Sequence, residues 1–92
     1  MKQQKFYIVR KQWRDGKEEG CCVVGDAGYV SQEKAREVMR MEFESAVDRW
    51  AERIGDKDIR TMTLFMNQRN IWDATCPSRY CYWWVDEITV ND

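Results

Sequence analysis

Hydrophobic and polar positions follow a helical period over one long stretch, residues 31–54. Hydrophobic residues recur three and four positions apart, which places them on one face of an α-helix, and charged residues of both signs fill the opposite face. Ser31 is a suitable N-cap and Gly55 a suitable terminator. The hydrophobic positions are Ala35, Val38, Met39, Phe43, Ala46, Val47, Trp50 and Ile54. The pattern predicts a helix that covers a sheet, with a helix that pairs with a partner helix as the alternative.

Segments rich in β-branched and aromatic residues lie on both sides of this helix. The predicted strands span residues 5–13, 18–24, 59–66, 71–74 and 79–90. Asp15-Gly16 separates the first two strands and is a favoured pair for a two-residue hairpin turn, which would pair Val9 with Cys22. Residues 25–28 contain two glycines and predict a loop. The order of elements predicts an α+β domain, ββαβββ, with a mainly antiparallel sheet and one long helix packed on one face.

The predicted sheet carries hydrophobic bulk on two faces. In the last strand, Tyr80, Tyr82 and Trp84 alternate with Cys81 and Trp83. One helix covers one face, so the second face either stays exposed as an interaction surface or is buried where a strongly twisted sheet closes into a half-barrel. Which of the two tryptophans points outward depends on a register that a single β-bulge would reverse.

Length, charge and hydropathy limit the classes of protein to which the chain can belong. A chain of 92 residues fits a single domain, residues 1–92, with a small core. Its 15 basic and 16 acidic residues give a net charge of −1, unlike a generally basic nucleic-acid binder. The N-terminus lacks the pattern of a signal peptide, and no hydrophobic run reaches the roughly 18 residues of a membrane span. We therefore expect a soluble cytoplasmic protein with reduced cysteines.

The sequence contains few of the residue patterns that are typical of catalytic or metal-binding sites. The chain has no histidine, which removes the usual Ser-His-Asp and Cys-His arrangements. Cys21 and Cys22 are neighbours in a predicted strand and point to opposite faces, and the spacing of Cys76 and Cys81 is not that of an established zinc knuckle. The carboxylates form no isolated acid–base pair, and no glycine-rich phosphate loop is present. We expect no enzyme activity, no cofactor and no metal.

Binding of a protein partner is the function that the sequence favours. Tryptophan, tyrosine and arginine are the residues most enriched in interface hot spots. The candidate partner-binding residues are Trp13, Trp72, Arg79, Tyr80, Tyr82, Trp83 and Trp84. The partner is either another protein or a second copy of the chain in a homodimer. In size and architecture, the chain is similar to small accessory proteins of bacteria, phages and mobile elements. Some of these, including anti-CRISPR-type inhibitors, bind and block a larger protein, and the resemblance implies such an inhibitor.

Two alternatives remain open at this point. Single-stranded nucleic acid is bound by proteins that stack bases on sheet aromatics and follow the phosphates with basic residues. Residues 79–84 have this composition, and the first strand would add Arg10, Lys11 and Trp13 if it lies beside them. The second alternative is an accessory protein that associates only with itself.

Overall fold

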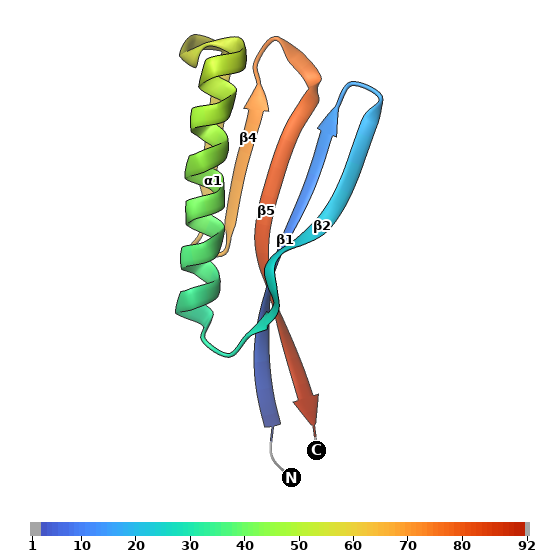
Figure 1. Cartoon of the computed structure of the whole chain (residues 1–92), viewed down its shortest axis with the longest axis vertical. Coiled ribbons are helices and arrows are strands. Elements are labelled where there is room, and N and C mark those ends of the chain that lie inside the picture. The colour runs from blue at the N-terminus through green and yellow to red at the C-terminus, as the bar shows by residue number, and fades with distance from the viewer. Residues whose placement is uncertain (1–2, 92) are drawn as a thin grey trace.

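The computed structural model of the chain describes residues 3–91 and places one helix on one face of an antiparallel sheet (Figure 1). The elements are β1 (Gln3–Asp15), β2 (Glu18–Tyr29), α1 (Gln32–Ile54), a short 3-10 helix η1 (Asp56–Asp58), β3 (Ile59–Leu64), β4 (Gln68–Asp73) and β5 (Cys76–Asn91). The five strands lie in the order β2-β1-β5-β4-β3. The predicted α+β class and the ββαβββ order are confirmed.

Helix α1 begins and ends where the sequence predicts. The Ser31 hydroxyl accepts a hydrogen bond from the Lys34 N–H at 3.2 Å, as an N-cap does. At the other end, Gly55 has a φ of 86°, which ends the helix, and its N–H donates to the Ala51 carbonyl at 3.0 Å. The hydrophobic stripe of the helix faces the sheet. Its fully buried members are Ala35, Met39 and Ala46.

The hairpin turn differs by one residue from the prediction. Its central residues are Gly16 and Lys17 rather than Asp15 and Gly16, because Asp15 remains in β1. Gly16 takes a φ of 68° at the first central position, the pattern of a type II′ turn. Its N–H also donates to the Ser78 carbonyl of β5 at 3.0 Å, so a contact outside the hairpin holds the turn in this position.

The register of the hairpin shifts by two residues as a result. Val9 pairs with Val24, not with Cys22, but a shift of two leaves every side chain on its predicted face. The predicted loop at residues 25–28 instead forms part of β2, as an irregularity in the pairing between Val24 and Tyr29.

Strand β4 begins three residues before its predicted start, at Gln68. The polar stretch between the predicted strands 59–66 and 71–74 indicated a turn at residues 67–70. Residues 68–70 instead belong to β4, which pairs with β3 on one side and with β5 on the other. Pairing on both sides gives the backbone N–H and C=O groups of β4 hydrogen-bond partners. For this reason even its polar residues form a strand rather than a turn. The turn consists of residues 65–67, and β5 begins at Cys76 rather than at Arg79.

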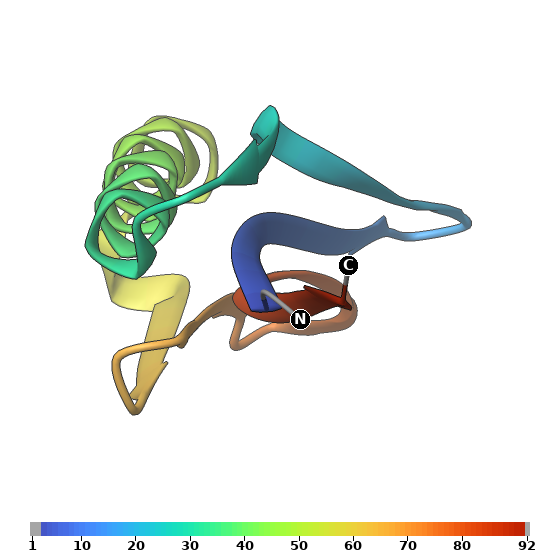
Figure 2. The same ribbon diagram turned by 90° about the horizontal axis from the view of Figure 1, so that it is seen from below.

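The core lies between α1 and the sheet face that it covers. Trp83 of β5 is fully buried there, and its ring meets that of Phe43 edge to face at 5.8 Å between centroids. The other fully buried strand residues, Val9, Ile71 and Cys81, share this face. The sheet is strongly twisted and bends around the helix, yet β2 and β3 stay apart at its two ends (Figure 2). The half-barrel alternative is therefore wrong for the part of the chain that the structure describes.

Replacing Trp83 is expected to destabilise the fold far more than replacing its neighbour Trp84. A fully buried tryptophan changed to alanine typically lowers the free energy of unfolding by about 3–5 kcal/mol, because a cavity remains. Urea unfolding followed by circular dichroism of Trp83→Phe, Trp83→Ala and Trp84→Ala measures the difference. An equal loss of stability for Trp83→Ala and Trp84→Ala would contradict the assignment of the two faces.

Candidate binding face

The sheet face away from α1 is formed by alternate residues of all five strands. Because successive strand residues point to opposite sides, the burial of Trp83 under the helix places Trp84 on the uncovered side. We call this surface the open face. It consists of Glu19, Cys21 and Val23 of β2, Arg10, Gln12 and Arg14 of β1, Tyr80, Tyr82 and Trp84 of β5, Gln68, Asn70 and Trp72 of β4, and Arg60, Met62 and Leu64 of β3.

The registers arrange these side chains in three rows across the sheet. In each row an aromatic residue of β5 stands between a polar residue of β1 and a residue of β4. The rows are Arg14–Tyr80–Trp72–Arg60, Gln12–Tyr82–Asn70–Met62 and Arg10–Trp84–Gln68–Leu64. Aromatic rings thus occupy the centre of the open face, and hydrogen-bond donors flank them on both sides.

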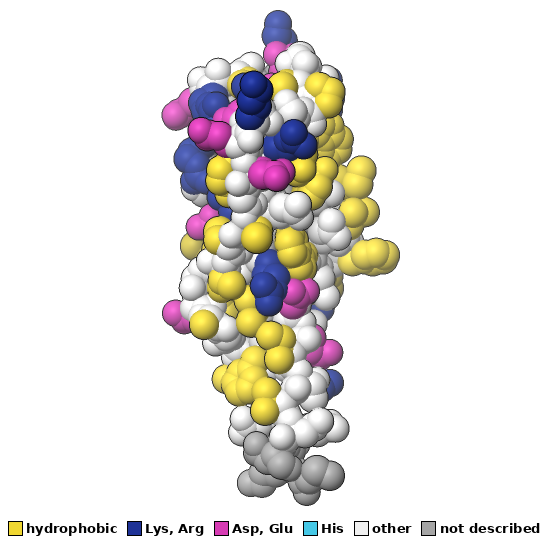
Figure 3. All heavy atoms as spheres, turned by 90° about the vertical axis from the view of Figure 1, so that its right-hand side faces the viewer, with side chains coloured by type: hydrophobic (Ala, Val, Ile, Leu, Met, Phe, Trp, Pro, Cys, Tyr) yellow, Lys and Arg dark blue, Asp and Glu magenta, His cyan; other side chains and the backbone are white. Residues whose placement is uncertain are grey.

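The aromatic side chains of the open face are held in place yet reach solvent. Tyr80 and Tyr82 stack with 4.8 Å between ring centroids and 20° between ring planes. These two tyrosines, Trp72 and Trp84 are all partly exposed, and no residue of the open face is fully buried. Hydrophobic side chains gather along one side of the elongated molecule in the space-filling view (Figure 3). The rings are therefore available to a partner without unfolding.

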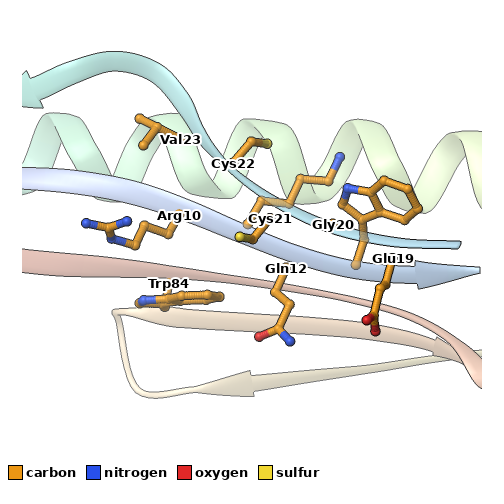
Figure 4. Close-up of a pocket in the computed structure, with 10 residues that line it drawn as sticks. Arg10, Gln12, Glu19, Gly20, Cys21, Cys22, Val23 and Trp84 are labelled. Carbon is orange, nitrogen blue, oxygen red and sulfur yellow. The ribbon is translucent and has the colours of Figure 1, made fainter.

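A hollow of about 680 Å³ lies along β1 and β2 and is lined by residues of both sides of this hairpin. Arg10, Gln12 and Trp84 extend from the same side of β1 and β5 into this region (Figure 4). Arg10 Nε lies 2.6 Å from Asp86 Oδ2, but its N–H is not directed well enough at the oxygen to count as a hydrogen bond. Both side chains are about two-fifths exposed, so the ion pair is weak and the guanidinium remains available to a ligand.

Four of the seven predicted partner-binding residues come together on the open face: Trp72, Tyr80, Tyr82 and Trp84. The other three, Trp13, Arg79 and Trp83, lie on the helix side and drop out of the candidate site. Trp83 is part of the core, and Lys11 Nζ lies 5.8 Å from its ring centroid. The Trp13 ring lies directly over Gly20, where an added Cβ would come within 3.0 Å of it.

Strand β1 lies beside β5, as the nucleic-acid alternative supposed. Of the three residues that it named there, only Arg10 belongs to the open face, because Lys11 and Trp13 point to the helix side. Sequence reasoning missed Gln12, Arg14 and the polar residues of β4 as members of the face. The alternation of side chains along β1 indicates which of its residues share a face. Assigning Gln12 and Arg14 to the open face also requires the knowledge that β1 is the neighbour of β5.

Arg79 has a structural role, at the end of the sheet where the hairpin tip meets the β4–β5 turn. Its Nε lies 3.1 Å from Asp15 Oδ1 and its Nη1 lies 3.0 Å from Asp73 Oδ2. Arg53 at the end of α1 adds a contact to Asp15 at 3.3 Å. Asp73 is buried, and its Oδ1 accepts hydrogen bonds from the hydroxyl and the backbone N–H of Thr75 at 2.6 and 2.8 Å.

This cluster lowers the pKa of both carboxyl groups from their usual value of 3.8. For Asp15 the main cause is the hydrogen bond from Arg79, followed by that from Arg53. For Asp73 the main causes are the two hydrogen bonds from Thr75, followed by the one from Arg79. The ionised forms of both residues therefore stabilise the folded state.

The cysteines do not form a metal site in the described part of the chain. Cys21, Cys22, Cys76 and Cys81 are free thiols there, and no three Cys, Asp or Glu side chains among residues 3–91 come together as ligands. Cys81 belongs to the core, and burial raises the pKa of its thiol to about 12. This thiol is protonated at neutral pH and packs as a small hydrophobic group.

Within residues 3–91, no helix is long and apolar enough to cross a membrane. In comparisons with family models, curated proteins and solved structures, the chain matches none of them. The candidate site therefore depends on the geometry of the chain's own residues.

Acid is expected to destabilise the protein through Asp15 and Asp73. Because their folded pKa values are lowered, their stabilising contribution is complete above about pH 5 and is lost as the pH falls through the unfolded and then the lowered folded values. Urea unfolding at pH 6 and pH 3 measures this loss. Asp73→Asn should be less stable at pH 6 and lose less on acidification. Asp48→Asn, which changes a helix carboxylate outside the cluster, is the control. A full acid loss in Asp73→Asn would contradict the role of the cluster.

Proposed function

We propose that the protein is a non-enzymatic module that binds a larger protein through its open face and inhibits that protein by covering its surface. The observation that carries the proposal is the placement of Trp72, Tyr80, Tyr82 and Trp84 together, partly exposed, on the sheet face that no element of residues 3–91 covers. Exposed hydrophobic patches of this kind mark interaction sites on folded domains.

The side chains of the open face supply the chemistry of an interface. Tyrosine and tryptophan offer large, rigid contact areas with a polar atom, and arginine adds charged donors at the edge. Arg10, Arg14 and Arg60 flank the rings, and the amides of β4 add donors and acceptors. Hydrogen-bond donors and aromatic rings therefore make up most of this set, and Glu19 and Cys21 of β2 lie opposite Arg14 and Gln12 at its border. The composition fits a partner surface with hydrophobic and acidic groups.

Substitution of the central aromatic residues is expected to weaken partner binding without unfolding the domain. A protein captured from cells on the immobilised chain would be purified and its affinity measured by calorimetry. Trp84→Ala or Tyr82→Ala should each cost about 2 kcal/mol, roughly a 30-fold rise in Kd, as is typical of hot spots.

Met41→Ala is the matched control, because this methionine of α1 is 58% exposed and lies away from the open face. Circular dichroism would verify that each variant is folded. A purified partner that binds Trp84→Ala and Tyr82→Ala as tightly as it binds the wild type would contradict the proposal.

Single-stranded nucleic acid is a second candidate ligand for the same face. The observation in its favour is the stacked pair Tyr80 and Tyr82, with Arg14 and Gln12 directly opposite them on β1. Bases stack on such rings, and arginine contacts the phosphates.

An oligonucleotide titration followed by tryptophan fluorescence distinguishes this candidate from the first. Binding should quench the emission and weaken steeply as salt is raised. The affinity should fall about 5- to 150-fold in Tyr82→Ala, because base stacking contributes about 1–3 kcal/mol per base. Unchanged emission with mixed-sequence single strands at low salt would exclude nucleic acid. Arg40→Ala, on the exposed surface of α1, is the control for general loss of positive charge.

A further inference from the structure

Strand β3 forms one end of the sheet and is paired on one side only, with β4. All its residues from Arg60 to Leu64 are exposed, including Thr61 and Thr63, which point toward the helix side. The helix therefore leaves this edge uncovered, and a six-residue strand presents backbone groups that a further strand can pair with.

Edge strands are usually protected from such pairing by charges, proline or bulges. The strand at the opposite end, β2, has two of these devices: Glu18 and Glu19 at its start, and a break in its pairing between Val24 and Tyr29. In contrast, β3 carries one charged residue, Arg60, and no proline, and it pairs with β4 in an unbroken register. It presents Met62 and Leu64, with 44% and 36% of their surface exposed.

We propose that the uncovered edge of β3 pairs antiparallel with β3 of a second copy of the chain, with Met62 of both copies at the two-fold axis. This register is self-complementary. Met62 meets Met62, Thr61 meets Thr63, and each Arg60 meets a Leu64, so no like charges stand opposite each other. Methionine pairs and threonine pairs across neighbouring strands are favourable contacts on the two faces of a sheet.

The β3–β4 turn adds a second reason for this register. Phe65 is 90% exposed and has a φ of 57°, a left-handed conformation that a bulky residue rarely adopts. Arg69 Nη1 donates to the Phe65 carbonyl at 3.1 Å and helps to hold the turn. With Met62 at the axis, Phe65 comes level with Ile59 of the second copy, so the dimer would give this exposed ring a hydrophobic neighbour.

The pairing of two β3 edges produces a dimer to which no third copy can add through β3. This self-association goes beyond the proposed function. A two-fold contact between identical edges uses up both β3 strands, and the outer strands of the joined sheet are then the protected β2 strands. The joined sheet would have two open faces side by side, because Met62 and Leu64 belong to the open face of each copy. A dimer would therefore offer two binding faces to a partner in one continuous surface.

Light scattering and sedimentation across a dilution series test the proposal. The wild type should show twice the chain mass of 11.1 kDa at high concentration. Met62→Lys and Met62→Glu should each raise the dimer dissociation constant at least about tenfold, because like charges then meet at the axis. An equimolar mixture of the two variants should restore dimers, now heterodimers, since opposite charges meet. Met41→Lys, a change of the same kind on the exposed helix surface, should dimerise like the wild type.

The remaining outcomes would overturn the proposal. A wild type that stays monomeric up to about 1 mM lacks the contact. A dimer that survives Met62→Lys uses another surface, and one that is lost in Trp84→Ala but not in Met62→Lys uses the open face. Variants that do not recover in the mixture refute the register with Met62 at the axis. Because Trp84→Ala leaves β3 intact, failure of partner binding and failure of dimerisation are measured separately.

Discussion

A single helix can cover only one face of a five-stranded sheet, and the rest of this structure follows from that constraint. The contact that fixes which face is covered is the one between Phe43 of α1 and Trp83 of β5, edge to face at 5.8 Å. Burial of these large rings contributes strongly to folding, because aromatic side chains remove the largest hydrophobic areas from water. Once Trp83 points to the helix, alternation places Tyr80, Tyr82 and Trp84 on the opposite side. The same contact thus builds the core and produces the open face.

The long central strands then determine what surrounds the aromatic residues. β1 and β5 pair without interruption from Gln3–Asn91 to Asp15–Arg79, which aligns an alternating series of arginine and glutamine with the aromatic series of β5. The charge cluster at one end of this ladder joins the hairpin tip, the end of α1 and the β4–β5 turn through Asp15, Arg79 and Asp73. These ion pairs join the ends of the three central strands to one another and, through Arg53, to the helix. Arg79 points to the helix side and is therefore not a contact residue on the open face.

The edges of the sheet differ as much as its faces do. Acidic residues and an irregular register protect β2 from pairing with a further strand. In contrast, β3 is regular, exposed and followed by a hydrophobic turn. The uncovered face presents side chains and the unprotected edge presents backbone groups, and both are features through which a folded domain can associate. The two adjoin at β3, whose Met62 and Leu64 belong to the open face.

The sequence by itself determined the type and the order of the helix and the five strands, but not all of their ends. The period of Ala35, Met39 and Ala46, with Ser31 and Gly55 at the ends, located α1 because these signals are local to the helix. It also determined that hydrophobic bulk lies on two faces of the strands, since alternation needs no knowledge of neighbours. Only the tertiary structure decided which face is covered, because both alternating series of β5 carry large hydrophobic residues and either would suit a core. The position of Gly16 in the hairpin turn and the extension of β4 to Gln68 likewise depend on contacts with β5. The open face brings together residues of five strands, and the order of those strands is set by long-range pairing that local patterns do not encode.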